Sequence, residues 1–190
     1  ILLSVASAAD YDLDPTLRSV HWNDTRLARV YSETTVDGSV EEVWAALSHY
    51  AAVHEISQAV YASDFVGEPA PLGEDCTRYC RIEFSGRDVY VEERIFAYEE
   101  GHYYTYEVFN VENFPVDTMN VTFGVRPAAD GRAVVFNLVD YRLKPATMTH
   151  MMRGQMSQST WTSVLSYRHW VEQGEGGLTL EELEALYFDG

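Results

Sequence analysis

The chain has 190 residues, of which 46% are hydrophobic and 13% aromatic, and this is sufficient for one domain with a substantial core. Its 30 acidic residues outnumber 13 basic ones, giving a formal net charge of −17. This balance argues against nucleic acid and anionic membrane surfaces as partners, because both require a basic surface. No stretch is long and apolar enough to span a membrane.

Two features bear on the compartment and disagree. Ala6-Ser7-Ala8 fits the small-residue cleavage site of an exported protein. Cys76 and Cys80 would lie about 13 Å apart on one strand at ~3.3 Å per residue, too far for a disulfide. Two free thiols favour a reducing compartment, so we expect a cytoplasmic protein and leave export open.

The N-terminal half begins with an extension, residues 1–28, in which Asp14-Pro15-Thr16 is typical of a helix start. A first strand is expected over Arg29–Val36. Ser39 and Glu42 form a capping box that predicts a short helix, and a second short helix is expected over Tyr50–Ile56.

The middle of the chain alternates apolar and polar residues as strands do. Turn residues separate the segments, and Asp130-Gly131 is the clearest hairpin signal. Six further strands are expected at Ala59–Val66, Cys76–Phe84, Val89–Tyr98, Tyr103–Val111, Met119–Arg126 and Ala133–Leu143.

After Pro145 the apolar period changes to three or four residues, which predicts one long helix over 145–172. Methionines are concentrated in its first half. Gly174 to Gly177 ends it, and Thr179 with Glu182 caps a last short helix in the tail, residues 174–190.

This order resembles the START/Bet v 1-like (SRPBCC) superfamily, in particular its polyketide cyclase/dehydrase-like branch. The resemblance rests on Val40-Glu41-Glu42-Val43-Trp44 with Tyr50, on Val91 to Ile95, on Tyr104-Thr105-Tyr106 and on the Asp130-Gly131 hairpin. It covers residues 29–173. It implies an α+β helix-grip fold, in which a seven-stranded curved antiparallel sheet wraps around a long C-terminal helix, with two short helices after the first strand.

The resemblance also implies a cavity between sheet and helix, and it suggests which residues face that cavity. By analogy with the family's register, Phe136, Leu138, Asp140 and Arg142 point inward on the last strand. Asp140 and Arg142 would then either pair with each other or hold a polar end of a ligand. A register shift of one residue would turn all four outward.

Other candidate ligand contacts come from neighbouring elements. Arg78 shares a face with Cys76, Cys80, Ile82 and Phe84, which we interpret as the inner face. On the strand expected over Tyr103–Val111, either Tyr104 and Tyr106 or Glu107 point inward, and we prefer the tyrosines. The long helix offers Met152, Gln155, Met156 and Ser159.

No catalytic set can be assigned. The chain lacks HExxH, GxGxxG and P-loop patterns, and neither a metal site nor a cofactor is predicted. The leading hypothesis is a protein that binds a hydrophobic small molecule, such as a lipid, polyketide or isoprenoid. The alternatives are an aromatase/cyclase-type enzyme using the same cavity, and an interaction module with a solid interior. The oligomeric state stays open.

Overall fold

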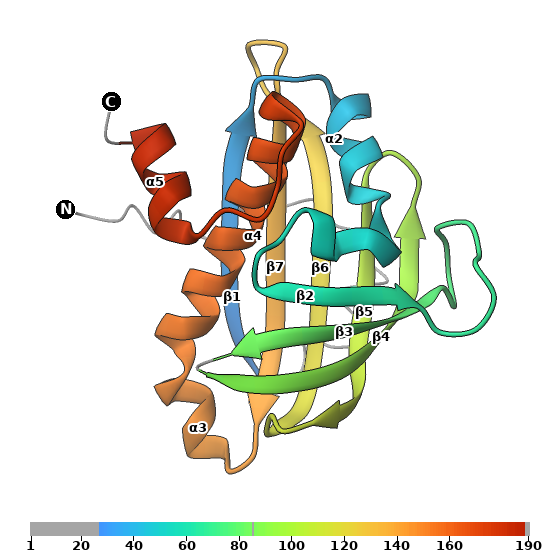
Figure 1. Cartoon of the computed structure of the whole chain (residues 1–190), viewed down its shortest axis with the longest axis vertical. Coiled ribbons are helices and arrows are strands. Elements are labelled where there is room, and N and C mark those ends of the chain that lie inside the picture. Colours follow the sequence, from blue (N-terminus) through green and yellow to red (C-terminus); the bar gives the residue numbers. More distant parts are fainter. Residues whose placement is uncertain (1–26, 85, 189–190) are drawn as a thin grey trace.

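The computed structural model describes residues 27–84 and 86–188 (Figure 1). The expected helix start at Asp14, the Ala6-Ser7-Ala8 segment and most of the expected extension lie outside these residues. The elements in chain order are β1 Ala28–Val36, α2 Val40–Leu47, the 3-10 helix η1 Tyr50–Glu55, β2 Val60–Phe65, β3 Thr77–Phe84, β4 Arg87–Glu99, β5 Tyr103–Glu112, β6 Val116–Pro127, β7 Ala133–Leu143, α3 Ala146–Met151, α4 Arg153–Gln173 and α5 Leu180–Phe188.

The seven strands form one antiparallel sheet in the order β1-β7-β6-β5-β4-β3-β2. The first and last strands of the chain order are therefore neighbours, and every strand from β2 to β7 pairs with its predecessor or successor in sequence. The sheet curves strongly, so that β2, β3 and β4 cross in front of β7 and β6 (Figure 1). These features confirm the predicted α+β helix-grip architecture.

The short helix α2 begins as its sequence predicts. The Ser39 side chain accepts a hydrogen bond from the Glu42 backbone amide at 3.2 Å, and the Glu42 carboxylate accepts one from the Ser39 amide at 2.8 Å. This reciprocal capping box satisfies two amides that a helix start leaves unpaired. Val43, Ala46 and Leu47 then face the core.

The long helix departs from the prediction at Met152, where α3 ends and α4 begins. Gly174 ends α4 in the left-handed conformation at φ 73°, which glycine adopts without steric cost. The tail then returns along α4. The Trp161 indole N–H donates to Glu184 of α5 at 3.0 Å, and Leu183 is fully buried.

One end of the space between sheet and helices is filled by aromatic rings. The centre of the Tyr104 ring lies 5.5 Å from that of Tyr50 and 6.3 Å from that of Trp44. The ring centres of Phe123 and Tyr167 of α4 lie 5.3 Å apart. Closely packed rings of this kind leave little open volume. The open volume lies toward the other end of α4.

Candidate functional site

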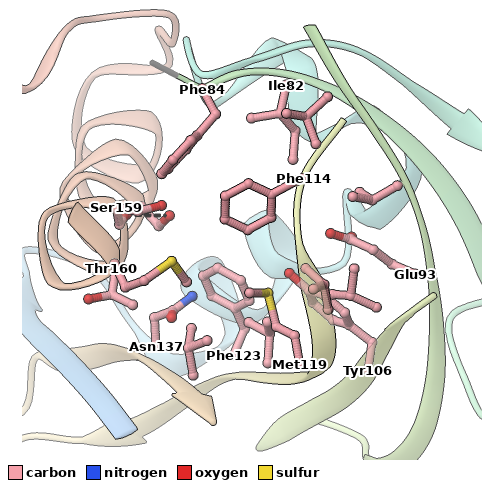
Figure 2. Close-up of a pocket in the computed structure, with 18 residues that line it drawn as sticks. Ile82, Phe84, Glu93, Tyr106, Phe114, Met119, Phe123, Asn137, Ser159 and Thr160 are labelled. Carbon is pink, nitrogen blue, oxygen red and sulfur yellow. Dashed lines mark hydrogen bonds between the residues drawn. The ribbon is translucent and has the colours of Figure 1, made fainter. Parts of the chain in front are cut away.

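A cavity of about 140 Å³ lies between the concave face of the sheet and α4 (Figure 2). Most of its wall is aliphatic or aromatic. The lining residues are Ile82, Phe84, Val89, Val91, Glu93, Tyr106, Val108, Phe114, Val116, Met119, Val121, Phe123, Asn137, Val139, Met156, Ser159, Thr160 and Ser163.

The strand walls follow the two-residue period of a sheet. Side chains alternate between faces, so every second residue of a strand reaches the cavity. On β4 these are Val89, Val91 and Glu93, and on β7 they are Asn137 and Val139. One face of each of these strands therefore lines the cavity.

The helix wall consists of Met156 and three small side chains. Ser159, Thr160 and Ser163 of α4 line the cavity, and their short side chains leave room between helix and sheet. The Thr160 hydroxyl is bonded to that of Ser32 on β1 at 2.8 Å, and the Ser163 hydroxyl donates to the Ser159 carbonyl at 2.9 Å. These hydroxyls are already satisfied by the protein.

Two half-buried phenylalanines stand at one end of the cavity. The ring of Phe84, at the end of β3, meets that of Phe114, between β5 and β6, edge to face at 5.0 Å. Figure 2 shows Phe114 projecting inward between Phe84 and Glu93.

The sheet itself splits beside Phe114. Pairing between β5 and β6 ends at Glu107 opposite Asn120, although β5 continues to Glu112 and β6 begins at Val116. Val108, Phe114, Val116 and Met119 lie between the cavity and a second hollow on the far side of this split. The cavity and this hollow therefore adjoin.

A buried ion pair adjoins the cavity. The Arg78 guanidinium donates to Glu93 at 2.5 Å and to the Tyr50 carbonyl, and its carbon lies 4.1 Å from the centre of the Tyr50 ring. Arg78 and Glu93 are only 3% and 5% exposed. Burial opposes the charge of Arg78 most strongly, but the Glu93 carboxylate together with the neighbouring Cys80, Tyr50 and Tyr106 side chains outweighs this cost and holds the Arg78 pKa above its usual value.

Only one member of this pair reaches the cavity. Glu93 lines it and Figure 2 shows its carboxylate directed inward, whereas Arg78 is not part of the wall. The wall therefore carries a carboxylate whose charge is compensated by Arg78, on the side of Glu93 away from the cavity.

Two more polar groups belong to the wall. Tyr106 lies beside Glu93, and burial raises the pKa of its phenol well above the usual value, so that the phenol stays protonated at neutral pH. Asn137 is 2% exposed, and its side-chain oxygen has no hydrogen-bond partner in the described structure. Asn137 and Glu93 lie on opposite sides of the cavity (Figure 2).

Several expected residues face inward. Tyr104 and Tyr106 belong to the core, whereas Glu107 pairs with Arg94 on the outer face, so the preferred orientation of β5 is confirmed. Tyr106, Met156 and Ser159 line the cavity. Tyr104 lies deeper, in the aromatic cluster.

Three other expected contacts are not part of the wall. Arg78 is on the inner face of β3, as predicted, but behind Glu93. Met152 packs against the core without reaching the cavity, and Gln155 is exposed on α4.

The predicted orientation of the last strand is wrong by one residue. Phe136, Leu138, Asp140 and Arg142 lie on the face of β7 opposite to the cavity. Asp140 binds Arg29 of β1 at 2.7 Å, and Arg142 binds Asp117 of β6 at 2.5 Å, so they do not pair with each other. Both faces of β7 are buried from Ala133 to Tyr141, so its apolar residues do not distinguish inside from outside.

Glu93 and Asn137 were missed by the sequence analysis. A usable signal existed for Glu93, because Val89, Val91 and Ile95 share its face at two-residue spacing and all are buried. For Asn137 no comparable signal exists on a strand buried on both faces.

The described residues include neither a membrane-spanning helix nor a metal-binding cluster. No described helix is long and apolar enough to cross a membrane. Within residues 27–84 and 86–188, no three His, Cys, Asp or Glu side chains gather in a way that could hold a metal ion.

Comparison with solved structures shows the same fold at low sequence identity. The ZhuI aromatase/cyclase from Streptomyces sp. R1128 aligns with a TM-score of 0.65 at 13% identity, over 86% of this chain and 98% of that one. A START superfamily protein from Mycobacterium smegmatis gives 0.63 at 13%, over 76% and 97%. Ara h 8.0201 gives 0.58 at 18%, over 77% and 98%.

Sequence comparison identifies the family of the chain more directly than these structural similarities do. No curated protein matches it. Residues 28–176 match the model of the family described as "Polyketide cyclase / dehydrase and lipid transport", and this span includes all seven strands, α2 and α4. The chain therefore belongs to the polyketide cyclase/dehydrase and lipid transport family of the START/Bet v 1-like superfamily.

Proposed function

We propose that the protein binds a hydrophobic small molecule in the cavity between the sheet and α4. The observation that carries this proposal is the wall itself: a partly enclosed, largely apolar surface with a few polar groups at defined positions, as in small-molecule sites generally. The family description names lipid transport among its members' roles, which agrees with a binding function.

The volume limits the size of the ligand. An apolar cavity of about 150 Å³ in another protein holds benzene, so about 140 Å³ holds one aromatic ring. Drug-sized ligands occupy roughly 300 Å³ or more. A larger ligand would have to displace lining side chains such as the half-buried Phe84 and Phe114, whose ring centres lie 5.0 Å apart.

A pair of matched variants tests this site. Ser163 and Thr162 are neighbours on α4, and each hydroxyl donates to the carbonyl four residues earlier at 2.9 Å. Only Ser163 lines the cavity. Ser163→Phe should fill the cavity and abolish binding of 4-fluorotoluene, followed by fluorine NMR, whereas Thr162→Phe should leave binding intact.

Native mass spectrometry after mild extraction provides a complementary test. We expect an apolar compound to co-purify with the wild-type protein and to be absent from the Ser163→Phe variant. Equal binding of 4-fluorotoluene by both variants would contradict the proposal.

Catalysis on a polyketide chain in the same cavity is the second candidate. Glu93 favours it, because a carboxylate on the cavity wall can accept a proton from a bound substrate. The structural neighbour from Streptomyces is an aromatase/cyclase. Conversion of a poly-β-ketone mimic by the wild-type protein, lost in the double variant Arg78→Met with Glu93→Met while the mimic still binds, would establish this second function.

A further inference from the structure

Glu93 is a charged residue on a wall that is otherwise mostly apolar, and its carboxylate is directed into the cavity (Figure 2). Resting on the proposed binding function, we propose that the ligand carries an uncharged hydroxyl group on an apolar body, and that this hydroxyl donates a hydrogen bond to Glu93. The ligand class is thus an aromatic or alicyclic alcohol rather than a hydrocarbon, an acid or an amine.

The carboxylate is held in place from behind. Arg78 binds one Glu93 oxygen at 2.5 Å and is itself fixed by the Tyr50 carbonyl and by the Tyr50 and Tyr106 rings, at 4.1 and 5.3 Å from its guanidinium carbon. The Tyr50 hydroxyl also donates to the Glu93 backbone carbonyl at 2.9 Å. An acceptor fixed in this way needs no rearrangement to receive a donor.

The charges of the pair already cancel, and this selects an uncharged donor. A ligand ammonium would add one uncompensated positive charge to a buried site. A ligand carboxylate would meet Glu93 as a like charge, because Arg78 lies behind Glu93 and does not line the cavity. A hydroxyl gains the hydrogen bond without either penalty.

A hydrocarbon of the same shape is also disfavoured. It would cover the Glu93 carboxylate without offering a donor, and a buried acceptor left unpaired costs free energy. The Asn137 oxygen on the opposite wall is a second acceptor without a partner among the described residues.

Four probes with one apolar body separate these cases: 4-methylphenol, 4-fluorotoluene, 4-methylbenzoate and 4-methylbenzylamine. Dissociation constants would be measured by NMR titration at pH 7. We expect 4-methylphenol to bind at least about tenfold more tightly than 4-fluorotoluene, because a hydrogen bond to a charged acceptor is among the stronger ones. The two ionised probes should bind more weakly than 4-methylphenol.

Replacing the whole pair assigns the preference to Glu93. Glu93→Gln alone would leave Arg78 buried without its partner, so the test variant is Arg78→Met with Glu93→Met. In this double variant 4-methylphenol should lose its advantage while 4-fluorotoluene still binds. The control is Arg94→Met with Glu107→Met, an exposed pair on the outer face of β4 and β5, which should leave the preference unchanged.

The outcomes distinguish this inference from the binding function on which it rests. If 4-fluorotoluene binds the wild-type protein as tightly as 4-methylphenol, or if the preference survives in the Met-Met variant, the donor assignment is wrong and the binding function stands. Tightest binding of 4-methylbenzoate would also overturn it. If none of the four probes binds, both proposals fall.

Discussion

At the residue scale, the Arg78–Glu93 pair loses hydration free energy on burial but supplies a polar group to the cavity wall. Two charges at 3% and 5% exposure lose most of their hydration, and packed hydrophobic residues in their place are often no less stable. The pair lies where one partner can meet a ligand and the other can balance its charge. Its position at the cavity is therefore better explained by binding than by stability.

Breaking this pair should destabilise the fold. We expect Arg78→Met to lower the free energy of unfolding by about 3–5 kcal/mol, because Glu93 is left as a buried, unpaired charge. Urea unfolding followed by circular dichroism measures the change. The double variant, Arg78→Met with Glu93→Met, should recover most of the loss.

An exposed pair on the same two strands is the control. Arg81 and Asp88 lie 2.8 Å apart with about half of each side chain in solvent, so Arg81→Met should leave the urea midpoint nearly unchanged. A similar loss in both single variants would mean that burial of the Arg78 pair is not what makes it costly to break.

Residue orientation was predictable where one face of a strand is polar. On β5, placing Glu107 outward and Tyr106 inward follows from alternation alone, and the structure confirms it. On β7 the same reasoning fails, because Phe136 and Val135 are both buried on opposite faces. Burial on two faces removes the contrast on which a register prediction depends.

At the scale of elements, the split between β5 and β6 should affect local dynamics. Between Tyr103 and Glu107 the two strands are paired, whereas beyond Glu107 they are not. We expect backbone amides of 108–112 and 116–119 that face the split to exchange with deuterium faster than those of 103–107, because they lack a cross-strand acceptor there. Amide exchange followed by NMR resolves this residue by residue.

The exchange experiment also has an internal reference. On their other sides, β5 pairs with β4 and β6 with β7 along the same stretch, so amides that face those strands should stay protected. Uniform protection of all amides from 103 to 112 would show that the split is closed in solution.

The start of α4 offers a stabilising substitution. A Cβ added to Gly154 would have no neighbouring atom within 4 Å, and Gly154 lies in a helix, where glycine is less favourable than alanine. Gly154→Ala should therefore raise the free energy of unfolding by about 0.5–1 kcal/mol, measured by urea unfolding.

Gly124 on β6 makes a contrasting control. A Cβ there would overlap the Phe136 ring and lie 2.8 Å from the His102 carbonyl oxygen, so Gly124→Ala should destabilise the protein. If Gly154→Ala also destabilised it, the first turn of α4 would need glycine for a reason other than space.

Element prediction succeeded where the signals are local. The capping box at Ser39 and the Thr179–Glu182 cap each satisfy amides within one turn, and the structure has both. The break at Met152 has no such cap; the one local signal is Gly154, two residues later, whose low helix propensity is compatible with a kink, while the apolar period continues unchanged. Cavity volume was not predictable either, since it depends on how side chains from several strands and α4 pack together.

At the scale of the whole molecule, aromatic rings fill one end of the space between the sheet and α4, and the cavity occupies the other end. Tyr50, Tyr104, Tyr106 and Tyr167 are all buried, and Cys80 lies beside Glu93. Desolvation raises the pKa of each of these five groups above its usual value, so in the folded protein all five stay protonated to a higher pH than in the unfolded chain.

These shifts give stability a predictable dependence on pH. A group whose pKa is raised by folding stabilises the protein fully below its unfolded pKa, and the contribution is lost as pH rises toward the folded value. Unfolded thiols titrate near about 8.5 and tyrosines near about 10, so stability should begin to fall above about pH 8.5 and fall faster above about pH 10. Each group contributes a slope of about 1.4 kcal/mol per pH unit once its unfolded form has lost its proton.

Urea midpoints measured at pH 7, 9, 10 and 11 would test this dependence. Cys80→Ala provides the control, because it removes the most buried thiol and should flatten the decline between about pH 8.5 and 10 while leaving the steeper tyrosine-dependent fall above it. A midpoint that stayed constant up to pH 11 in the wild-type protein would mean that the rings and the thiol are hydrated in solution. In that case the ring-filled end of the space between the sheet and α4 would be as accessible to water as the cavity.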